Sequence, residues 1–212
     1  MTDTLTDLID RLHREAKQDR PAAETPDVGI VMGSDSDLKV MLTGGPRRGA
    51  YDAFVEELGF AEQTDFEDPP AERFTFETYV TSAHRTPDLM RAYARTAEDR
   101  GLEVVIAGAG GKSADLPNMT ASYAYPLPVI GVPVQEKSVD SVIGMPAGAP
   151  LVAVDAGKSF NAALAAGQML ARQYPAVRDR LVAYHEGLQG GVGDSSRRLH
   201  DEGVESYSAS DR

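Results

Sequence analysis

The sequence predicts an α/β protein, namely a three-layer α/β/α sandwich built around a parallel sheet. Two observations predict this fold. Short apolar runs bounded by glycine or proline alternate with segments of helical spacing along the chain, and most of the runs have the profile of strands buried on both faces. Helices that connect parallel strands then cover both faces of the sheet, through crossovers that are nearly always right-handed. The 212 residues fit one domain of ordinary size.

Five strands are expected, each from a short run of apolar or β-forming residues. The run at 27–32, DVGIVM, is stopped by Gly33 and Ser34. The run at 74–80, FTFETYV, alternates and is rich in β-formers. The other strands are expected at residues 102–107, 127–132 and 151–154.

Segments of helical spacing fill the intervals between these strands. Ser36 or Asp37 is expected to cap a helix that runs through Met41. Residues 51–58 form a second helix, for which Gly59 is a suitable C-cap. A third begins at Thr86-Pro87, where proline in the first turn costs little because its missing N–H is not needed. Further helices are expected at residues 113–122, 159–172 and 175–186.

The chain is expected to have three parts. Residues 1–26 are a helical or partly ordered extension, residues 27–188 form a single catalytic α/β domain, and residues 189–212, rich in glycine and serine, are a disordered tail. Two breaker-rich or polar stretches, residues 43–49 and 61–73, are expected to be loops.

The composition excludes several classes of protein and site. The absence of cysteine rules out disulfides and thiolate chemistry, and the four histidines, at 13, 84, 185 and 200, are too scattered for a local metal motif. A net charge of −12 disfavours nucleic acid as a partner, since that affinity comes largely from Lys and Arg. No apolar run approaches the ~20 residues of a membrane helix, and the polar first residues are no secretory signal, so a cytoplasmic location is expected.

The charge balance also favours a halophilic protein with a surface adapted to high salt. Only 5 of the 21 basic residues are lysine, and acidic residues exceed basic ones. Counterions at high salt would screen the self-repulsion of such a surface. The alternative is an ordinary acidic cytosolic protein.

Four loops are expected to meet at one edge of the sheet. Ligands of a parallel sheet bind at the carboxyl ends of its strands, near the point where the strand order reverses. The loops that follow these ends are GSDSD (33–37), TSAHRTP (81–87), GAGGKSADLPNM (108–119) and the stretch 133–150. Their convergence is the main reason to expect a binding site there.

Two of these loops carry the side chains best suited to chemistry. GSDSD offers hydroxyl groups and backbone N–H groups at a helix start, which suit a phosphate, although the same motif is equally a helix N-cap without a ligand. In SAHRTP, His84 can give and take a proton near neutral pH. The neighbouring Arg85 can donate two hydrogen bonds to a phosphate or carboxylate.

The third loop is glycine-rich. Its GAGGK turn lets the backbone approach a ligand closely, and Lys112 carries a charge that attracts anions. Taken alone, the turn is better explained as a tight strand-to-helix connection.

Taken together, these motifs resemble a known family. VGIVMGSDSDLKVM, SAHRTP, IAGAGGKSADLPNM, LPVIGVPV, MPAGAP and NAALAAGQML occur in the order found in the N5-carboxyaminoimidazole ribonucleotide mutase family, also called PurE, the catalytic subunit of phosphoribosylaminoimidazole carboxylase. The resemblance extends over residues 27–172 and implies a flavodoxin-like fold. It also implies a homo-octamer with sites shared between subunits, and neither metal nor organic cofactor. The implied substrate is a small ribonucleotide of de novo purine biosynthesis.

The resemblance further implies the role of each site residue. Ser34 and Asp37 would bind the nucleotide, with Ser34 near its phosphate, and Arg85 would hold that phosphate. Ser82 and Ala83 would line the same edge, and the amides of Gly110 and Gly111 would steady a carboxylate. The N5-carboxylate would leave as carbon dioxide, which C4 of the ring attacks, while His84 acts as general acid and then general base.

One position departs from the family pattern. The family commonly reads AAHLPG where this chain has SADLPN, so Asp115 stands in place of a second active-site histidine. An aspartate there would orient a partner or hold the substrate amine.

Two other functions compete with the mutase. One is direct carboxylation of aminoimidazole ribonucleotide by dissolved carbon dioxide. The other, from a different class, is a non-enzymatic receiver or nucleotide-binding module. Ala107-Gly108 stands where a receiver needs an acceptor aspartate, which argues against that module.

Overall fold

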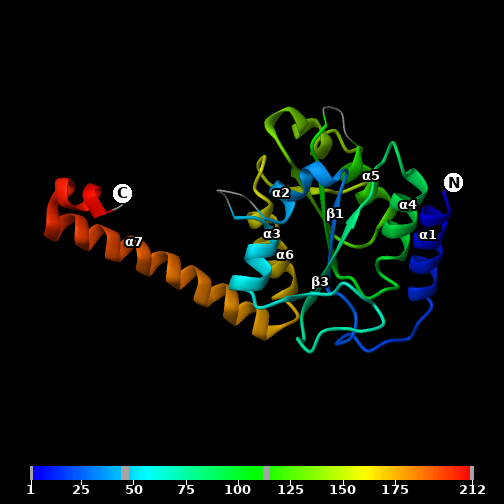
Figure 1. Cartoon of the computed structure of the whole chain (residues 1–212), viewed down its shortest axis with the longest axis horizontal. Helices are drawn as coiled ribbons and strands as arrows, with labels where there is room; N and C mark the ends of the chain where they lie inside the picture. The colour runs from blue at the N-terminus through cyan, green and yellow to red at the C-terminus, as the bar shows by residue number, and fades with distance from the viewer. Residues whose placement is uncertain (1, 44–47, 112–114, 211–212) are drawn as a thin grey trace.

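A six-stranded parallel sheet forms the centre of the molecule (Figure 1). The computed structural model describes residues 2–43, 48–111 and 115–210. The strands lie in the order β2-β3-β1-β4-β5-β6, and every pair is parallel. Their bounds are β1 Val28–Met32, β2 Ala61–Glu62, β3 Thr75–Val80, β4 Val104–Ala109, β5 Val129–Pro133 and β6 Val152–Ala153.

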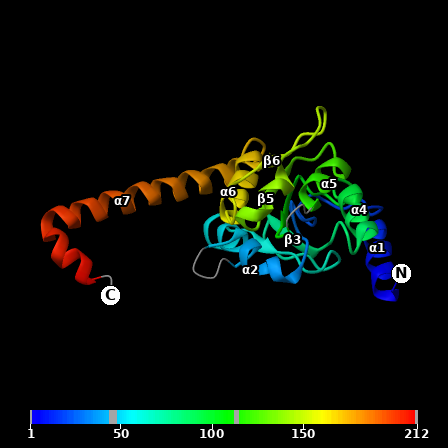
Figure 2. The ribbon, with the colours of Figure 1, turned by 90° about the horizontal axis from the view of Figure 1, so that it is seen from above.

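Helices cover both faces of this sheet, which confirms the predicted three-layer sandwich (Figure 2). One layer holds α2 (Leu38–Met41), α3 (Ala50–Asp52), η2 (Ala53–Glu57), α6 (Ser159–Leu170) and the beginning of α7 (Pro175–Ser210). The other holds α1 (Asp3–Glu15), α4 (Pro87–Thr96) and α5 (Leu116–Tyr123). The described residues also include two 3₁₀ segments, η1 (Asp35–Asp37) and η3 (Glu136–Val142).

The two hydrophobic cores follow from the alternation of side chains along each strand. Ile30 and Phe76 face α3, η2 and α6, whereas Val31 faces α4 and packs with Tyr93. All five residues of β1 are buried, as expected of a central parallel strand.

The five expected strands are present, and a sixth was missed. β2 lies within residues 61–73, which were expected to be a loop. Ala61 pairs with Thr75 and Glu62 pairs with Phe76 at the edge of the sheet. A strand of two residues in a polar stretch leaves no pattern that distinguishes it from a loop.

As far as the structure describes them, the residues before β1 pack on the domain through α1. Leu5, Leu8, Ile9 and Leu12 follow helical spacing along α1 and pack against the core beneath α4. Leu12 is completely buried. The boundary expected at residue 27 is therefore not a boundary in the packing, because α1 completes one helical layer.

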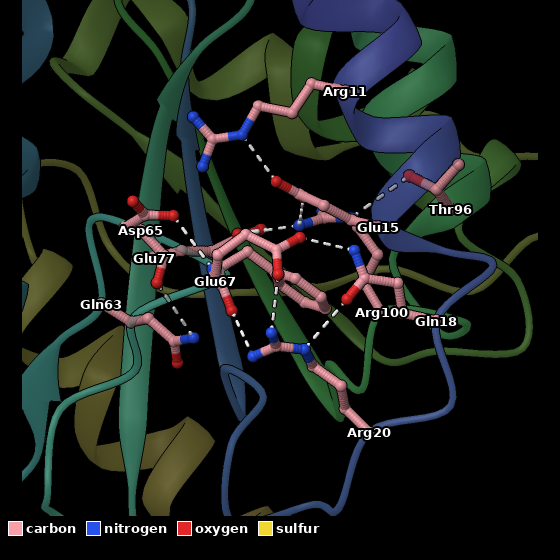
Figure 3. Close-up of polar contacts among 11 residues, drawn as sticks. Arg11, Glu15, Gln18, Arg20, Gln63, Asp65, Glu67, Glu77, Thr96 and Arg100 are labelled. Carbon is pink, nitrogen blue, oxygen red and sulfur yellow. Dashed lines mark hydrogen bonds and ion pairs between the residues drawn. The ribbon is translucent and has the colours of Figure 1, made fainter.

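A buried charge cluster joins α1 to the sheet (Figure 3). Arg100 is fully buried, and its Nη1 lies 2.8 Å from Glu77 on β3 and 3.6 Å from Glu15 on α1. Glu15 also pairs with Arg11, at 2.6 Å. Around the rim, Arg20 donates to Glu67 in the segment that follows β2.

The expected disordered tail is helical instead. α7 continues through residues 189–210, with a break at Gly203, whose φ is 76°. The first turns of α7 are already formed where the helix packs on α6. A formed helix can lengthen without a new nucleation step, which explains how a glycine-rich segment can extend α7. The side chains of residues 185–206 are all exposed, and the helix projects away from the domain (Figures 1 and 2). Among the described residues, no helix has the length and apolarity needed to cross a membrane.

Candidate active site

Loops from four strands line one pocket of about 500 Å³. The loops follow β1, β3, β4 and β5 at their carboxyl ends, and the strand order reverses between β1 and β4. The lining residues are Gly33, Ser34, Ser36, Asp37, Ser82, Ala83, His84, Arg85, Ala109, Gly110, Gly111, Asp115, Leu116 and Gln135.

The loop after β1 presents the half-buried hydroxyl of Ser34 and the buried carboxyl of Asp37. Ser34 is the N-cap of η1, and its hydroxyl accepts the N–H of Ser36 at 3.4 Å. Asp37 is only 7% exposed. Burial raises the pKa of the Asp37 carboxyl, against the lowering effects of the Ser34 N–H and of the positive charge on Arg85. The loop therefore serves both as a helix cap and as part of the pocket wall.

The loop after β3 holds Arg85 at the edge of the pocket. The hydroxyl of Thr86 accepts the N–H of Ser82 at 2.9 Å, and the hydroxyl of Ser82 accepts the N–H of Arg85 at 3.2 Å. The Arg85 guanidinium donates from Nη2 to the carbonyl of Gly33 at 2.7 Å. Its Nε also reaches the Ser82 hydroxyl at 3.5 Å, and because guanidinium has five donors, three N–H groups stay available to an anion.

His84 and Asp115 face each other across the pocket. His84 Nε2 lies 3.6 Å from Asp115 Oδ2, and the two side chains are 67% and 54% exposed. Asp115 directly precedes α5, and its carbonyl accepts the N–H of Met119 at 2.8 Å. The His84 imidazole can carry a proton, and the Asp115 carboxylate can accept a hydrogen bond from that ring.

The loop after β4 approaches the loop after β1 closely at Gly110. A Cβ on Gly110 would lie 2.5 Å from Asp37 Oδ1. The Gly110 carbonyl in turn accepts a hydrogen bond from the side-chain amide of Gln135. The Gly110 backbone and the Asp37 carboxyl therefore pack closely against each other at this wall of the pocket.

The structure brings nearly all of the predicted site residues together. Ser34, Asp37, Ser82, Ala83, His84, Arg85, Gly110, Gly111 and Asp115 all line the pocket, and Lys112 lies outside the described residues. Sequence reasoning did not single out Gln135, although the stretch 133–150 was expected at this edge. Of that stretch, as far as the structure describes it, only Gln135 lines the pocket.

Comparisons with known proteins agree with this architecture. The N5-carboxyaminoimidazole ribonucleotide mutase of Mycobacterium tuberculosis (strain ATCC 25618 / H37Rv) is 44% identical over 174 residues, covering 79% of this chain and 87% of that protein. The enzyme of the same name from Pyrococcus horikoshii is 38% identical over 191 residues, covering 87% and 95%. The crystal structure of Treponema denticola PurE shares the fold, with a TM-score of 0.62 at 21% identity, over 82% of this chain and 98% of that one.

The sequence model of the family described as AIR carboxylase matches residues 27–190. That range contains the whole sheet and every loop that lines the pocket. The chain belongs to the AIR carboxylase family.

Proposed function

We propose that this chain is a cytoplasmic enzyme of purine biosynthesis that converts N5-carboxyaminoimidazole ribonucleotide to 4-carboxy-5-aminoimidazole ribonucleotide. The reaction moves a carboxyl group within one molecule and makes the enzyme an isomerase. One observation carries the proposal: His84 and Arg85 share a single pocket with the Ser34 loop. The names of the relatives from M. tuberculosis and P. horikoshii support the same reaction.

The pocket suits a phosphorylated ribonucleotide. Arg85 can turn its unused N–H groups to a phosphate, which the Ser34 hydroxyl would also contact. The Asp37 carboxyl is the group that would accept a hydrogen bond from a ribose hydroxyl. These assignments require no metal ion.

In the proposed mechanism the bond between N5 and its carboxylate breaks first. Carbon dioxide leaves, and the nitrogen takes a proton from His84. C4 of the electron-rich ring then attacks the carbon dioxide, and His84 accepts the proton that C4 releases. Confinement in the pocket keeps carbon dioxide close and oriented, which has the entropic benefit of an intramolecular reaction.

The assembly and the surface belong to the same proposal. We expect a homo-octamer, and the exposed apolar side chains on α7, at Leu188, Val192 and Leu199, support an assembly in which this helix is covered. The net charge of −12 with few lysines supports adaptation to high salt.

Turnover of the two candidate substrates tests the function. We expect the purified chain to convert the N5-carboxy compound without added bicarbonate. His84→Asn should keep the circular dichroism spectrum and lower turnover at least ~100-fold, the usual scale for lost acid–base catalysis. His13→Asn, a change at an exposed histidine on α1, is the matched control and should keep full activity.

The remaining outcomes separate the rival functions. A strict requirement for bicarbonate together with aminoimidazole ribonucleotide would identify a direct carboxylase. Binding of nucleotide without conversion of either compound would identify a non-enzymatic module. Near-normal turnover by His84→Asn would remove His84 from its proposed role.

A further inference from the structure

We propose that Asp115 is a positioning residue for His84. Its carboxylate accepts the Nε2–H of the imidazole and so leaves Nδ1 as the nitrogen that exchanges the proton with the substrate. The inference rests on the proposed function, because it assigns the proton transfer to one atom of His84.

The two side chains come from different loops, and each loop is anchored. His84 lies in the turn fixed by the hydrogen bond from Ser82 N–H to Thr86 Oγ1. Asp115 lies at the start of α5, which is held by the buried Leu116 against Met90 and Ala109. The separation of 3.6 Å between Nε2 and Oδ2 is therefore set by the fold rather than by neighbours in sequence.

The chemistry of the pair decides the tautomer. A neutral imidazole has one donor nitrogen and one acceptor nitrogen, and an ionised carboxylate only accepts. An aspartate opposite Nε2 therefore favours the tautomer with its proton on Nε2 and its lone pair on Nδ1. The same carboxylate stabilises the ring once Nδ1 has taken a proton, as the aspartate of a Ser-His-Asp triad does.

The distance is longer than a hydrogen bond, and both groups are more than half exposed. Contacts between catalytic groups are often long in a free enzyme and tighten in the complex. Substrate that covers the pocket would exclude water and strengthen the attraction between the two groups. The coupling should thus appear in kcat, which reports the bound state, more than in KM.

A direct contact between Asp115 and the substrate amine is the competing role. That contact would be made with bound substrate whatever residue stood at 84. Its loss would raise KM and would add to the effect of His84→Asn. The positioning role instead predicts a nearly unchanged KM and no further loss in the His84→Asn background.

A double-mutant cycle separates the two roles. We expect Asp115→Asn to lower kcat roughly 10- to 100-fold with KM within about twofold, a part of the effect of losing the acid–base group itself. In a background of His84→Asn, the same change should cause no further loss. Asp88→Asn is the matched control and should leave both constants unchanged. Asp88 lies in the first turn of α4, 3.6 Å from Arg91, and is 53% exposed.

The ring of His84 provides a readout that does not depend on turnover. With ¹⁵N-labelled histidine, and His84→Asn to assign the signal, we expect the neutral ring to carry its proton on Nε2. Asp115→Asn should shift protons toward Nδ1, since an amide can donate to Nε2. Unchanged ring shifts, additive losses in the cycle, or a raised KM at constant kcat would each overturn the inference. Failure of the wild-type chain to convert either substrate would instead overturn the proposed function, with the ring spectra still testing the pair.

Discussion

At the scale of single residues, Arg85 connects two loops that are 52 positions apart in sequence. Its Nη2 donates to the Gly33 carbonyl, and its Nε lies 3.5 Å from the Ser82 hydroxyl. The guanidinium therefore stands at the pocket edge before any ligand arrives. A preformed position of this kind reduces the entropy lost on binding a phosphate.

Arg85→Ala should accordingly weaken nucleotide binding more than it slows the chemical step. We expect KM to rise roughly 10- to 100-fold, because a charge-assisted and bidentate contact is lost. Arg85→Lys should restore only part of the affinity, since an ammonium lacks the planar fork. Steady-state kinetics and calorimetric titration with the nucleotide product measure the effect. An unchanged affinity in Arg85→Ala would show that Arg85 merely links the two loops.

Asp27 gives a prediction about pH. Its carboxylate accepts the N–H of Thr75 at 2.8 Å and pairs with Arg73 at 3.1 Å. Burial nevertheless raises the pKa of Asp27 from 3.8 to about 6. Between these two values the folded chain holds a proton that the unfolded chain has released. The contribution of Asp27 to stability is therefore full below about pH 4 and is lost as the pH rises through about 6.

Asp27→Asn removes this dependence. Relative to the wild type, the free energy of unfolding of the variant should improve by about 1 to 1.5 kcal/mol between pH 5 and pH 7. Urea unfolding at both pH values, at one protein concentration, measures the difference. A difference that stays constant or changes in the other direction would contradict the raised pKa.

The residues of the pocket were predictable where they directly follow the end of a strand. His84, Arg85 and Ser34 follow strands that the sequence shows clearly, and the carboxyl ends of parallel strands must meet. Gln135 was not predictable in this way. Its reach to the Gly110 carbonyl depends on the turn after β5, where the Gln135 N–H donates to Ser138 Oγ. No local pattern in that stretch signals where the side chain will lie.

At the scale of elements, strands marked by an apolar or β-forming run were predictable, even the two-residue β6, whereas β2 in its polar stretch was not. β1 and β4 are continuous buried runs, whereas β2 has only two residues and is held by its pairing with β3. The apolar face of α1 is visible in the sequence, but its partner α4 is far away in the chain. Whether such a helix joins the domain depends on that contact, which only the fold supplies.

The charge cluster beneath α1 shows what that contact stabilises. Arg100 Nε donates to Thr96, and its guanidinium carbon lies 4.9 Å from the ring centre of Tyr93. Removing this cation would leave Glu77 buried without its ion-pair partner and Glu15 paired with Arg11 alone. A broken buried ion pair is strongly destabilising, because the remaining charge keeps its desolvation cost.

Arg100→Met should lower the free energy of unfolding by about 3–5 kcal/mol. Arg91→Met is the control, since Arg91 is 52% exposed and its pair with Asp88 spans 3.6 Å. That change should stay within about 0.5 kcal/mol of the wild type. Urea unfolding followed by circular dichroism compares the two. Equal effects of the two substitutions would show that the cluster does not hold α1 to the sheet.

At the scale of the whole molecule, two features are unexplained by a single chain. The surface carries a net charge of −12, and α7 leaves the domain with its outer half uncovered. Helical spacing places Leu181, Leu188, Val192 and Leu199 along one face of α7. The first of these packs on the α6 layer, and the other three are exposed. A row of apolar side chains that begins in the core and extends into solvent is expected to meet another protein surface.

Ending the chain after Gly187 tests whether this face holds an assembly together. The domain should fold unchanged, because the side chains of residues 185–206 are exposed and Val177 and Leu181 stay in place. The mass measured by light scattering should fall from that of the expected octamer to that of a smaller species.

In the full chain, the combined substitutions Leu188→Ser, Val192→Ser and Leu199→Ser should have the same effect. Arg197→Ser, on the opposite face of the helix, should leave the mass unchanged. An unaltered mass after truncation would mean that the assembly uses the domain alone. Sites shared between subunits, as the family resemblance implies, would require that assembly, so turnover should fall together with the mass if α7 is the connecting element.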